Sequence, residues 1–470
     1  MFAKIQRIHF VGIGGSGMSG IAEVLLNLGY KVFGSDLKST PVTERLAGLG
    51  AVIFEGHRAE NVAGAEVVVT SSAITPDNPE VEEARRQRVP VIPRAEMLAE
   101  LMRLKYGIAI AGMHGKTTTT SMIAAVLAAG GLDPTVVVGG RVDAMGSNAR
   151  LGKSHYLVAE ADESDRSFLK LSPILAVVTN IDREHMDCYR NMRDVKRAFL
   201  EFMDGVPFYG MVVACNDDPV LRKIMPQVKR RIVTYGTRRG SDFQISLGRP
   251  DSSSGGHRPF SRFQVRFGHR DLGEFTLRVP GAHNVLNATA AIAVGVGLDL
   301  AVDQIRAALD GFDGVDRRFQ LRGQAGGIRV VDDYGHHPTE IKATLSAARQ
   351  CGYRKIHVVF QPHRYTRTRD LFDQFATAFA DADTLLMLDI YPANELPIEG
   401  VTSEHLADQI RRAGHPAVRY VSSFAEAAEA ASLSAKEGDL VFTLGAGNVY
   451  QVGPMILEKI QAIQPVAAGK

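Results

Sequence analysis

The sequence predicts an α/β chain of three domains, with Rossmann-like domains at both ends and a mixed-sheet domain in the middle. Three observations predict this arrangement. Short apolar runs alternate with helix-like runs along most of the 470 residues, which is the rhythm of βαβ units. Two Gly-rich turns, at 12–17 and 112–117, each join an apolar run to a helix-like run. The pattern becomes polar and Gly/Ser-rich between 242 and 280. We expect domains at 1–104, 105–315 and 316–470.

Composition is that of an ordinary globular protein and excludes several classes. Apolar residues make up 45% and charged residues 23% of the chain, and the net charge of +2 predicts no nucleic-acid partner. The three cysteines have no CxxC spacing, so neither a zinc site nor a disulfide framework is expected. No apolar run is long enough to span a membrane, and no signal-peptide pattern precedes the first strand. These features predict a cytoplasmic protein without membrane insertion.

The first predicted domain opens with a phosphate-binding pattern. Gly12 to Gly17 reads G-x-G-x-x-G, follows an expected strand at 8–12 and precedes a helix-like run at 18–28. Asp36 closes the next expected strand. Such a turn places a diphosphate on a helix N-terminus, where backbone N–H groups and the helix dipole favour negative charge. The pattern alone leaves NAD, a sugar nucleotide and a turn without ligand as alternatives. The strands expected in this domain are 8–12, 31–34 and 67–71.

The central domain begins with the more specific of the two turns. Gly112-Met113-His114-Gly115-Lys116-Thr117 lies between an expected strand at 106–111 and an expected helix at 118–129. Its backbone N–H groups can hold phosphate oxygens, Lys116 can neutralise the β/γ phosphates, and the Thr117 hydroxyl can bind Mg²⁺. The turn is shorter than the usual P-loop, whose first glycine would fall at Ile110. We therefore expect a P-loop ATPase-like domain that is neither an ordinary motor ATPase nor a GTPase.

Polar clusters follow the next expected strands of this domain. Glu160 ends one strand and begins the run Glu-Ala-Asp-Glu-Ser-Asp, and a further strand is followed by polar residues that include His185. Carboxylates at the carboxyl edge of a sheet, beside a phosphate loop, are suitable Mg²⁺ ligands. A solvated acidic loop and a structural histidine remain the alternatives. The strands expected here are 156–160, 175–179 and 211–214, followed by a hairpin of 262–267 and 274–279 whose tip is 252–256.

Two loops of the third domain carry unusual sets of polar residues. One expected strand ends in Asp332-Asp333-Tyr334-Gly335-His336-His337, and another is followed by His363-Arg364-Tyr365-Thr366-Arg367. Arg364 and Arg367 could bind a small carboxylate as a pair, although a basic surface is the alternative. Before this domain, His283 and Asn284 introduce an expected helix at 288–296 and could face a base or cap the helix. The strands expected in the third domain are 328–331, 356–360, 384–388, 417–421 and 439–444.

Taken in order, these strings resemble the Mur ligases, ATP-dependent amide-forming enzymes of peptidoglycan precursor synthesis. Within that family the branch that attaches L-alanine to UDP-N-acetylmuramate is the most similar. Met113 stands where this family more often has Thr. The strings that carry the resemblance are GIGGSGMSGIA at 12–22, SSAI at 71–74, GMHGKTTT at 112–119, EADESD at 160–165, NIDREHMD at 180–187, HNVLN at 283–287, RRF at 317–319, DDYGHHP at 332–338, QPHRYTRT at 361–368 and GAGN at 445–448.

The resemblance implies a role for each domain and for particular residues. The first domain would hold the UDP-sugar, the second ATP, and the third would close over the amino acid. The UDP-sugar would contact Gly14, Gly15, Ser16, Gly17, Asp36, Ser71 and Ser72. ATP would contact Gly112, Met113, His114, Gly115, Lys116, Thr117, Thr118, His283, Asn284, Asn287, Arg318 and Asp333. The metal ligands would be Thr117, Glu160 and His185, the alanine ligands His336, Arg364 and Arg367, and the catalytic set Lys116, Glu160, His185, Arg318 and Asp333.

The resemblance also implies the reaction and its setting. ATP would convert the lactyl carboxylate of UDP-N-acetylmuramate into an acyl phosphate, which the alanine amine attacks to give an amide, ADP and phosphate. Mg²⁺ would be required, with Mn²⁺ as a possible substitute. The activity would serve cell-wall biogenesis, and through it cell shape and division, in a monomer or weak homodimer. Rival readings are a ligase that recycles a whole murein tripeptide, a nicotinamide dehydrogenase that uses the first turn, and a P-loop regulatory switch.

Overall fold

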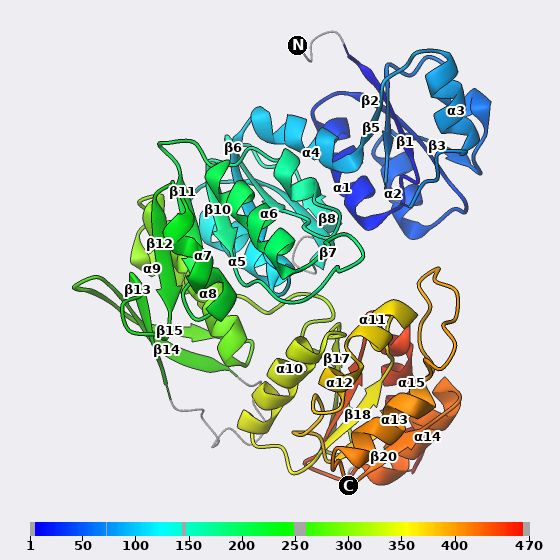
Figure 1. Cartoon of the computed structure of the whole chain (residues 1–470), viewed down its shortest axis with the longest axis vertical. Coiled ribbons are helices and arrows are strands. Elements are labelled where there is room, and N and C mark those ends of the chain that lie inside the picture. Colours follow the sequence, from blue (N-terminus) through cyan, green and yellow to red (C-terminus); the bar gives the residue numbers. More distant parts are fainter. Residues whose placement is uncertain (1–4, 72, 143–146, 249–259, 464–470) are drawn as a thin grey trace, which may run out of the picture. The chain divides into compact units, whose positions relative to one another are not determined.

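A computed structural model describes residues 5–71, 73–142, 147–248 and 260–463. These residues form three separate sheets, β1 to β5, β6 to β15 and β16 to β21, in chain order (Figure 1). Contacts group the chain into two compact units. The first holds the N-terminal sheet and most of the central sheet, and the second holds 312–463 with 276–285 and the described residues beside the 249–259 gap, 247–248 and 260–262. The expected three-domain α/β fold is confirmed.

The N-terminal sheet is parallel and has the strand order β3-β2-β1-β4-β5. Every residue from Ile8 to Val11 is buried, because helices cover both faces of the sheet and leave no solvent side. This is the doubly wound order expected of a Rossmann-like domain. The elements are β1 (Arg7–Val11), α1 (Ser16–Asn27), β2 (Lys31–Asp36), α2 (Pro41–Gly48), β3 (Val52–Glu55), the 3₁₀ helix Ala59–Val62, β4 (Val67–Thr70), α3 (Pro79–Arg86), β5 (Val91–Pro93) and α4 (Arg94–Arg103).

The buried carboxylate of Glu80 helps to hold β2, the strand to which the first Gly-rich turn is hydrogen-bonded. Glu80 accepts hydrogen bonds from Ser35 Oγ and Asn61 Nδ2, each at 2.5 Å, and its Oε2 lies 3.3 Å from His9 Nε2. Burial by itself would raise the pKa of Glu80, but the hydrogen bonds from His9, Ser35 and Asn61 outweigh it and lower that pKa. The Ser35 carbonyl oxygen in turn accepts the N–H of Gly12 at 2.8 Å. The network therefore holds the strand on which the turn rests.

The central sheet is mixed and has the order β15-β14-β13-β12-β11-β10-β6-β9-β7-β8. Its strands from β13 to β7 pair in parallel, whereas β8 is antiparallel to β7. The strands are β6 (Tyr106–Ala111), β7 (Thr135–Val142), β8 (Ser147–Arg150), β9 (Tyr156–Glu160), β10 (Leu175–Val178), β11 (Met211–Cys215), β12 (Ile232–Gly236), β13 (Phe243–Leu247), β14 (Ser261–Phe267) and β15 (Arg270–Leu277). The helices are α5 (Lys116–Ala129), α6 (Met192–Asp204), α7 (Pro219–Ile224), α8 (Ala282–Gly297) and α9 (Val302–Asp310).

The expected hairpin extends one end of this central sheet. β14 and β15 are joined by two residues and follow β13 at the edge, which confirms the hairpin and its place. The predicted tip at 252–256 lies outside the described residues. Helix α8 begins at Ala282, earlier than the expected 288, because the segment from His283 to Asn287 is itself helical. The polar side chains of that segment therefore lie on the first turns of α8.

The C-terminal sheet has the order β16-β17-β21-β18-β19-β20 and packs a separate core on each face. Val331, Val358 and Phe442 pack with α10 and α13 on one face, whereas their neighbours Val330 and Val359 pack with α14 and α15 on the other. Alternation of side chains along each strand explains the division. The elements are β16 (Gln320–Ala325), β17 (Ile328–Asp333), α10 (Pro338–Gln350), β18 (Ile356–Phe360), α11 (Tyr365–Asp370), α12 (Phe372–Phe375), β19 (Thr384–Met387), α13 (Ser403–Arg412), β20 (Val418–Tyr420), α14 (Phe424–Ser434), β21 (Leu440–Leu444) and α15 (Val452–Ile463).

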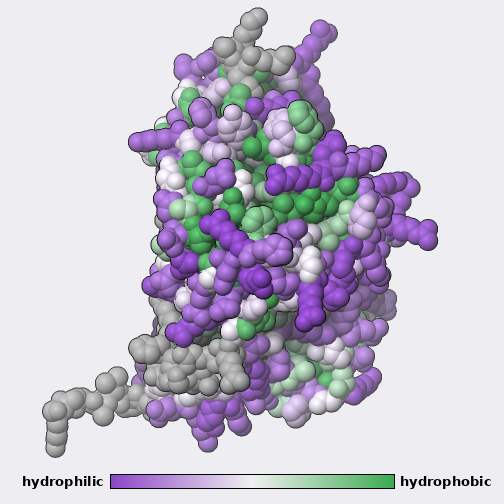
Figure 2. Space-filling view, turned by 90° about the vertical axis from the view of Figure 1, so that its left-hand side faces the viewer, coloured by the Kyte–Doolittle hydropathy of each residue, from purple (hydrophilic) through white to green (hydrophobic). Residues whose placement is uncertain are grey.

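The described surface is rich in hydrophilic side chains. Figure 2 shows one face on which purple hydrophilic residues predominate and green hydrophobic residues gather mainly in the upper half. Single exposed hydrophobic residues such as Leu37 and Leu396 are normal on globular proteins. Among the described helices, none combines the length and the apolar character needed to cross a bilayer.

Candidate active site

The phosphate loop of the central domain lies between β6 and α5, as the sequence predicts. Gly112 has φ +136° and Gly115 has φ +81°, backbone conformations that residues other than glycine rarely adopt. A β-carbon at Gly112 would lie 2.1 Å from Thr179 Oγ1, which leaves no room for one. The glycine therefore permits a close approach between the loop and the end of β10. The loop leads directly into Lys116, the first residue of α5.

Side chains that follow β10 brace this loop. Asn180 accepts the His114 N–H through Oδ1 and donates to the His114 carbonyl through Nδ2, both at 2.9 Å. Thr179 Oγ1 donates to the same carbonyl at 2.7 Å, and His114 Nε2 lies 3.0 Å from Asp182 Oδ2. The loop is thus held in shape by the neighbouring strand. His114, which we predicted as an ATP contact, is oriented by Asp182.

Lys116 contacts both the phosphate loop and the side chain of Glu163. Its Nζ donates to the Gly112 carbonyl at 2.6 Å and to Glu163 Oε1 at 2.8 Å. Burial by itself would lower the pKa of Lys116, but the charges of Glu163, Asp162 and Glu160 raise it above its ordinary value. The ammonium group is therefore charged at neutral pH, as a phosphate-binding lysine must be.

Carboxylates and an imidazole gather at the carboxyl edge of the central sheet, next to this lysine. Glu160 ends β9 directly opposite Ile110 of β6, so its position follows from strand register. His185 Nε2 lies 3.5 Å from Glu163 Oε1 and 3.9 Å from Glu184 Oε2, and the His185 backbone is left-handed at φ +57°. Non-glycine residues with such strained backbones cluster at functional sites.

These donors fit a magnesium ion. Carboxylate and hydroxyl oxygens are the ligands that Mg²⁺ takes in phosphate-transfer sites. Glu163 Oε2 is buried and has no hydrogen-bond partner within the described residues, which leaves an anionic oxygen available for a cation. Thr117 follows Lys116 at the start of α5 and is half-buried. Thr117, Glu160 and His185 stay predicted ligands, and Glu163 joins them as a neighbouring carboxylate that the sequence did not single out.

The remaining predicted nucleotide contacts of this unit lie close to the loop. Met113 and Thr118 are buried, and the Met113 carbonyl lies 3.4 Å from Lys116 Nζ. Asn287 projects from α8 toward the loop, since its Oδ1 would lie 2.7 Å from a β-carbon placed on Gly115. The structure therefore brings Asn287 and the phosphate loop together, although they are distant in sequence.

The Gly-rich turn of the N-terminal domain is closed by Asp36. The Asp36 carboxylate accepts the Gly14 N–H at 2.8 Å, and the Gly15 N–H bonds to the Gly12 carbonyl at 3.2 Å. Ser16 begins α1, as a phosphate-binding turn requires. Asp36 therefore stabilises the turn through its own hydrogen bond. Its predicted contact with the UDP-sugar stays a prediction.

Two further residues border this turn. A β-carbon at Gly17 would lie 2.1 Å from an Arg94 guanidinium nitrogen, so the glycine lets the arginine approach the first turn of α1. Sequence reasoning missed Arg94, which has no motif around it. Ser71 follows β4, and Ile74 of the same turn lies near Gly12. The predicted contact Ser72 lies outside the described residues.

Asp333 lies buried at the end of β17 in the C-terminal domain. Its carboxylate accepts the N–H of Phe319 at 2.8 Å and that of Gly335 at 2.7 Å. Burial raises the pKa of Asp333 to about 6, although the Arg318 charge and the two N–H donors oppose it. Arg318 lies over the Tyr334 ring at 5.2 Å and near Glu340 at 3.6 Å. The structure therefore brings Asp333 and Arg318 together, as the prediction requires.

We expect the raised pKa of Asp333 to set an acid limb in the pH–rate profile. A raised carboxyl pKa means that the folded protein binds the proton more tightly, so its contribution to stability is full below pH 3.8 and is lost as pH rises through about 6. If catalysis needs the ionised Asp333 carboxylate, activity instead rises as pH rises through the pKa of Asp333. In the wild type, kcat/KM for ATP should fall about tenfold per pH unit below pH about 6.

The variant Asp333→Asn provides the matched measurement, because it removes the titrating charge. Its amide keeps an acceptor for only one of the two N–H groups, so thermal unfolding has to be followed beside the kinetics. We expect kcat/KM to be low at every pH, with no acid limb between pH 5 and 8. An unchanged limb in this variant would assign the titration to another group.

The predicted amino-acid ligands meet at the carboxyl edge of the C-terminal sheet. Arg367 donates to His363 Nδ1 at 3.2 Å, and the His336 and His363 rings lie 5.8 Å apart. His363 stacks on Tyr391 at 5.5 Å. Burial, followed by the charges of His336, Arg367 and Arg364, lowers the pKa of His363 to about 3, so its ring is neutral. His363 and Tyr391 lie beside the predicted amino-acid ligands, and the sequence prediction gave neither of them a role.

Arg364 shows the features expected of an anion ligand. Its backbone is left-handed at φ +72°, and its Nε is buried without a hydrogen-bond partner in the described part of the chain. An unsatisfied guanidinium nitrogen inside a protein is costly unless a ligand completes it. A small carboxylate would supply the missing acceptor.

His283 and Asn284 lie at the start of α8. Burial lowers the pKa of His283 to about 4, with a further contribution from the Arg318 charge, so the imidazole is neutral at pH 7. Asn284 Nδ2 donates to the Pro280 carbonyl at 2.7 Å. The bond ties down the start of the helix and supports the structural alternative for Asn284, whereas a neutral His283 remains suited to facing a base.

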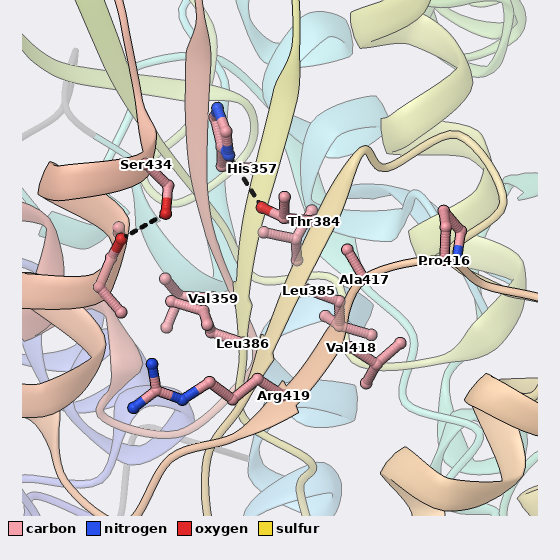
Figure 3. Close-up of a pocket in the computed structure, with 13 residues that line it drawn as sticks. His357, Val359, Thr384, Leu385, Leu386, Pro416, Ala417, Val418, Arg419 and Ser434 are labelled. Carbon is pink, nitrogen blue, oxygen red and sulfur yellow. Dashed lines mark hydrogen bonds between the residues drawn. The ribbon is translucent and has the colours of Figure 1, made fainter.

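A separate cavity of about 250 Å³ lies at the other end of the C-terminal sheet (Figure 3). It is lined by residues of β18, β19 and β20, by the two residues that precede β20, and by α14. His357 and Thr384 point toward one another there and are joined by a hydrogen bond of 2.8 Å. Ligands of doubly wound sheets bind at the carboxyl ends of the strands, so this cavity is not the candidate active site.

Comparison with known proteins assigns a family to this arrangement. Residues 7–106 match the Mur ligase family catalytic domain, 110–295 the Mur ligase middle domain, and 317–447 the Mur ligase glutamate ligase domain. A UDP-N-acetylmuramate–L-alanine ligase of Koribacter versatilis is 71% identical over 98% of this chain and 99% of its own. The chain belongs to the Mur ligase family.

Solved Mur ligases have the same fold. A UDP-N-acetylmuramate–alanine ligase of Thermotoga maritima is 30% identical, with a TM-score of 0.79 over 97% of this chain and 100% of its own. A murein peptide ligase of Psychrobacter arcticus is 24% identical, with a TM-score of 0.68 over 97% and 98%. Mur ligases are ATP-dependent, so the chain belongs to an ATP-dependent ligase family rather than to the nicotinamide dehydrogenases or the P-loop regulatory switches.

Proposed function

We infer that this Mur ligase joins L-alanine to the lactyl carboxylate of UDP-N-acetylmuramate at the expense of ATP, in peptidoglycan precursor synthesis. The observation that carries the inference is the whole-chain likeness to the ligase of Koribacter versatilis, 71% identical and bearing that name. The geometry agrees with it. A charged Lys116 beside the phosphate loop suits ATP, and a histidine and arginine cluster suits a small amino acid.

The reaction needs activation because a carboxylate is a poor acyl donor, whose leaving group would be oxide. Transfer of the γ-phosphoryl group to the lactyl carboxylate gives an acyl phosphate and ADP. The alanine amine then attacks the carbonyl carbon, the C–N bond forms, and phosphate leaves from a tetrahedral intermediate. Proximity and charge neutralisation supply most of the catalysis in such transfers.

The residues of the central domain would bring two anions together. Lys116 would neutralise the β/γ phosphates, and the backbone N–H groups of the loop would bind phosphate oxygens. Thr117, Glu160 and His185 would hold Mg²⁺, or Mn²⁺ in its place, which supplies further positive charge. The described contacts support this assignment through the bracing of the loop by Asn180 and the proximity of His185 to Glu163.

The C-terminal residues would orient the amino acid. Arg364 and Arg367 would bind the alanine carboxylate, with His336 beside them, so that the amine is free to attack. Arg318, Asp333 and His283 would approach the nucleotide. In the N-terminal domain, the turn from Gly14 to Gly17 would bind the diphosphate of the UDP-sugar, with Asp36 shaping the turn.

We further propose the cellular setting that this activity implies. The substrates are small and soluble, so the enzyme would act in the cytoplasm as a monomer or weak homodimer, without nucleic acid or membrane insertion. Its product would feed cell-wall synthesis and, through it, cell shape and division.

Phosphate release tests the proposed function. Purified protein with MgATP should release phosphate only when both UDP-N-acetylmuramate and L-alanine are present. Omission of either substrate should reduce release to background, because the acyl phosphate is productive only when the amine follows. Release that requires the murein tripeptide in place of alanine would move the protein to the recycling ligases. Release without any sugar nucleotide would contradict ligase chemistry.

A further inference from the structure

Glu163 occupies an unusual position in the nucleotide site. Its side chain is 1% exposed, and its Oε1 lies 2.8 Å from Lys116 Nζ and 3.5 Å from His185 Nε2. Its Oε2 is also buried and has no hydrogen-bond partner within the described residues. The backbone is fixed as well, since Tyr189 Oη donates to the Glu163 carbonyl at 2.6 Å. The carboxylate is therefore held firmly but only half satisfied.

The unpaired Glu163 Oε2 indicates that this oxygen binds a ligand when the site is occupied. A buried carboxylate oxygen without a donor costs free energy unless a cation or donor completes it. An anionic substrate would worsen the deficit, whereas a divalent cation would remove it. Two adjacent ligand atoms of an octahedral Mg²⁺ lie about 3 Å apart. The 3.5 Å separation between Glu163 Oε1 and His185 Nε2 is close to that spacing.

Lys116 supplies the second part of the argument. In this structure its ammonium group is engaged by Glu163, yet a phosphate-binding lysine must release a competing carboxylate when phosphate arrives. Once Lys116 turns to the phosphates, Glu163 loses its counter-ion. A buried carboxylate without a counter-charge is strongly unfavourable, so another cation has to take the place of the lysine.

We propose that Glu163 exchanges partners: it holds Lys116 while the phosphate site is empty, and faces the divalent cation beside His185 when the nucleotide is bound. This inference rests on the proposed use of ATP with a divalent cation. It makes metal and nucleotide binding cooperative through a single side chain. Without metal, Glu163 retains the lysine and repels phosphate; with metal, it contributes to the bound state.

Nucleotide binding by Glu163→Gln tests the exchange without the other substrates. The non-hydrolysable β,γ-imido analogue of ATP would be titrated calorimetrically in EDTA and in Mn²⁺. In EDTA we expect the variant to bind about tenfold more tightly than the wild type, because the amide no longer competes for Lys116. The factor by which Mn²⁺ improves binding should fall about tenfold, because a neutral amide is a weaker ligand.

A matched control lies in the same turn. Asp165 is exposed and accepts the Ser167 N–H at 2.9 Å, an acceptor role that Asp165→Asn preserves. Both dissociation constants of this control should stay within about twofold of the wild type, since exposed charges are screened. Mn²⁺ electron paramagnetic resonance of the nucleotide complex gives an independent readout, in which the Glu163→Gln signal should differ from the wild type and the Asp165→Asn signal should not.

Each outcome decides the inference. An unchanged Mn²⁺ effect in Glu163→Gln would overturn the metal-facing role, and an unchanged affinity in EDTA would overturn the hold on Lys116. Should Glu163→Gln fold poorly, Glu163→Asp keeps the charge on a shorter side chain and is expected to lose the Mn²⁺ gain alone. Neither sugar nor alanine enters these measurements, so an error in the proposed substrates would leave them unchanged.

Discussion

Replacing Lys116 by alanine should reduce ligase turnover on the order of 10³-fold, the largest effect expected of any single substitution in this chain. The ammonium group lies 2.6 Å from the Gly112 carbonyl, at the start of α5, and is charged because three carboxylates surround it. Without it the γ-phosphate would carry its charge uncompensated as the lactyl carboxylate approaches. Steady-state phosphate release with saturating substrates gives the measurement.

Loss of stability is the effect to separate from loss of chemistry. Lys116→Ala leaves Glu163 without its counter-ion, which lowers the free energy of unfolding, so thermal unfolding has to be followed beside the kinetics. The double variant Lys116→Met/Glu163→Gln removes both charges and should recover most of that stability while turnover stays low. Lys170→Ala is the control, since Lys170 is exposed and pairs only with Glu96 among the described contacts. Substantial turnover in either Lys116 variant would contradict the role of this lysine.

Replacing Arg367 by alanine should raise the KM for alanine roughly 10²-fold and leave the KM for ATP nearly unchanged. The guanidinium group donates to His363 Nδ1 and lies at the carboxyl edge of β18, where a small carboxylate would be bound. A charge-assisted pair of this kind contributes mainly to substrate binding, so kcat should fall less than kcat/KM. Initial rates at varied alanine, with saturating MgATP and UDP-N-acetylmuramate, give both constants.

The same helix supplies the control for this prediction. Arg369 is about half exposed and pairs with Asp370, and Arg369→Ala should leave the KM for alanine within about twofold. Arg367→Lys keeps the charge without the planar fork and should recover part of the affinity. If Arg367→Ala keeps the wild-type KM for alanine, the arginine does not bind the amino acid.

Three of the buried strands could be predicted from the sequence to the residue. The expected strands at 106–111, 156–160 and 356–360 coincide with β6, β9 and β18. A strand covered on both faces must be apolar along its whole length, so the ends of the apolar run mark the ends of the strand. Edge strands escape this rule, because one of their sides faces solvent and short polar segments suffice. The sequence prediction missed β3, β5, β8 and β16, each at a sheet edge, and it also missed β7, β12 and β13, which lie inside the central sheet.

The candidate site divides in a similar way. The motif residues Lys116, Glu160, His185, Asp333 and Arg367 could be selected in advance because strand ends and glycine turns mark where a doubly wound sheet binds its ligands. Their partners could not, as Asn180, Glu163 and Tyr391 act through contacts made across neighbouring strands and turns.

The sequence by itself determined the fold class and the edge of each sheet at which ligands are expected, because these depend on local patterns of apolar residues and glycines. The family resemblance came from the motif strings. Only the tertiary structure decided that Glu163, rather than another carboxylate of the same acidic run, engages Lys116. The reason is physical. Strand register sets which residue ends beside the phosphate loop, but the turn that follows β9 sets where each later side chain points. The Tyr189 hydroxyl holds that turn through its hydrogen bond to the Glu163 carbonyl.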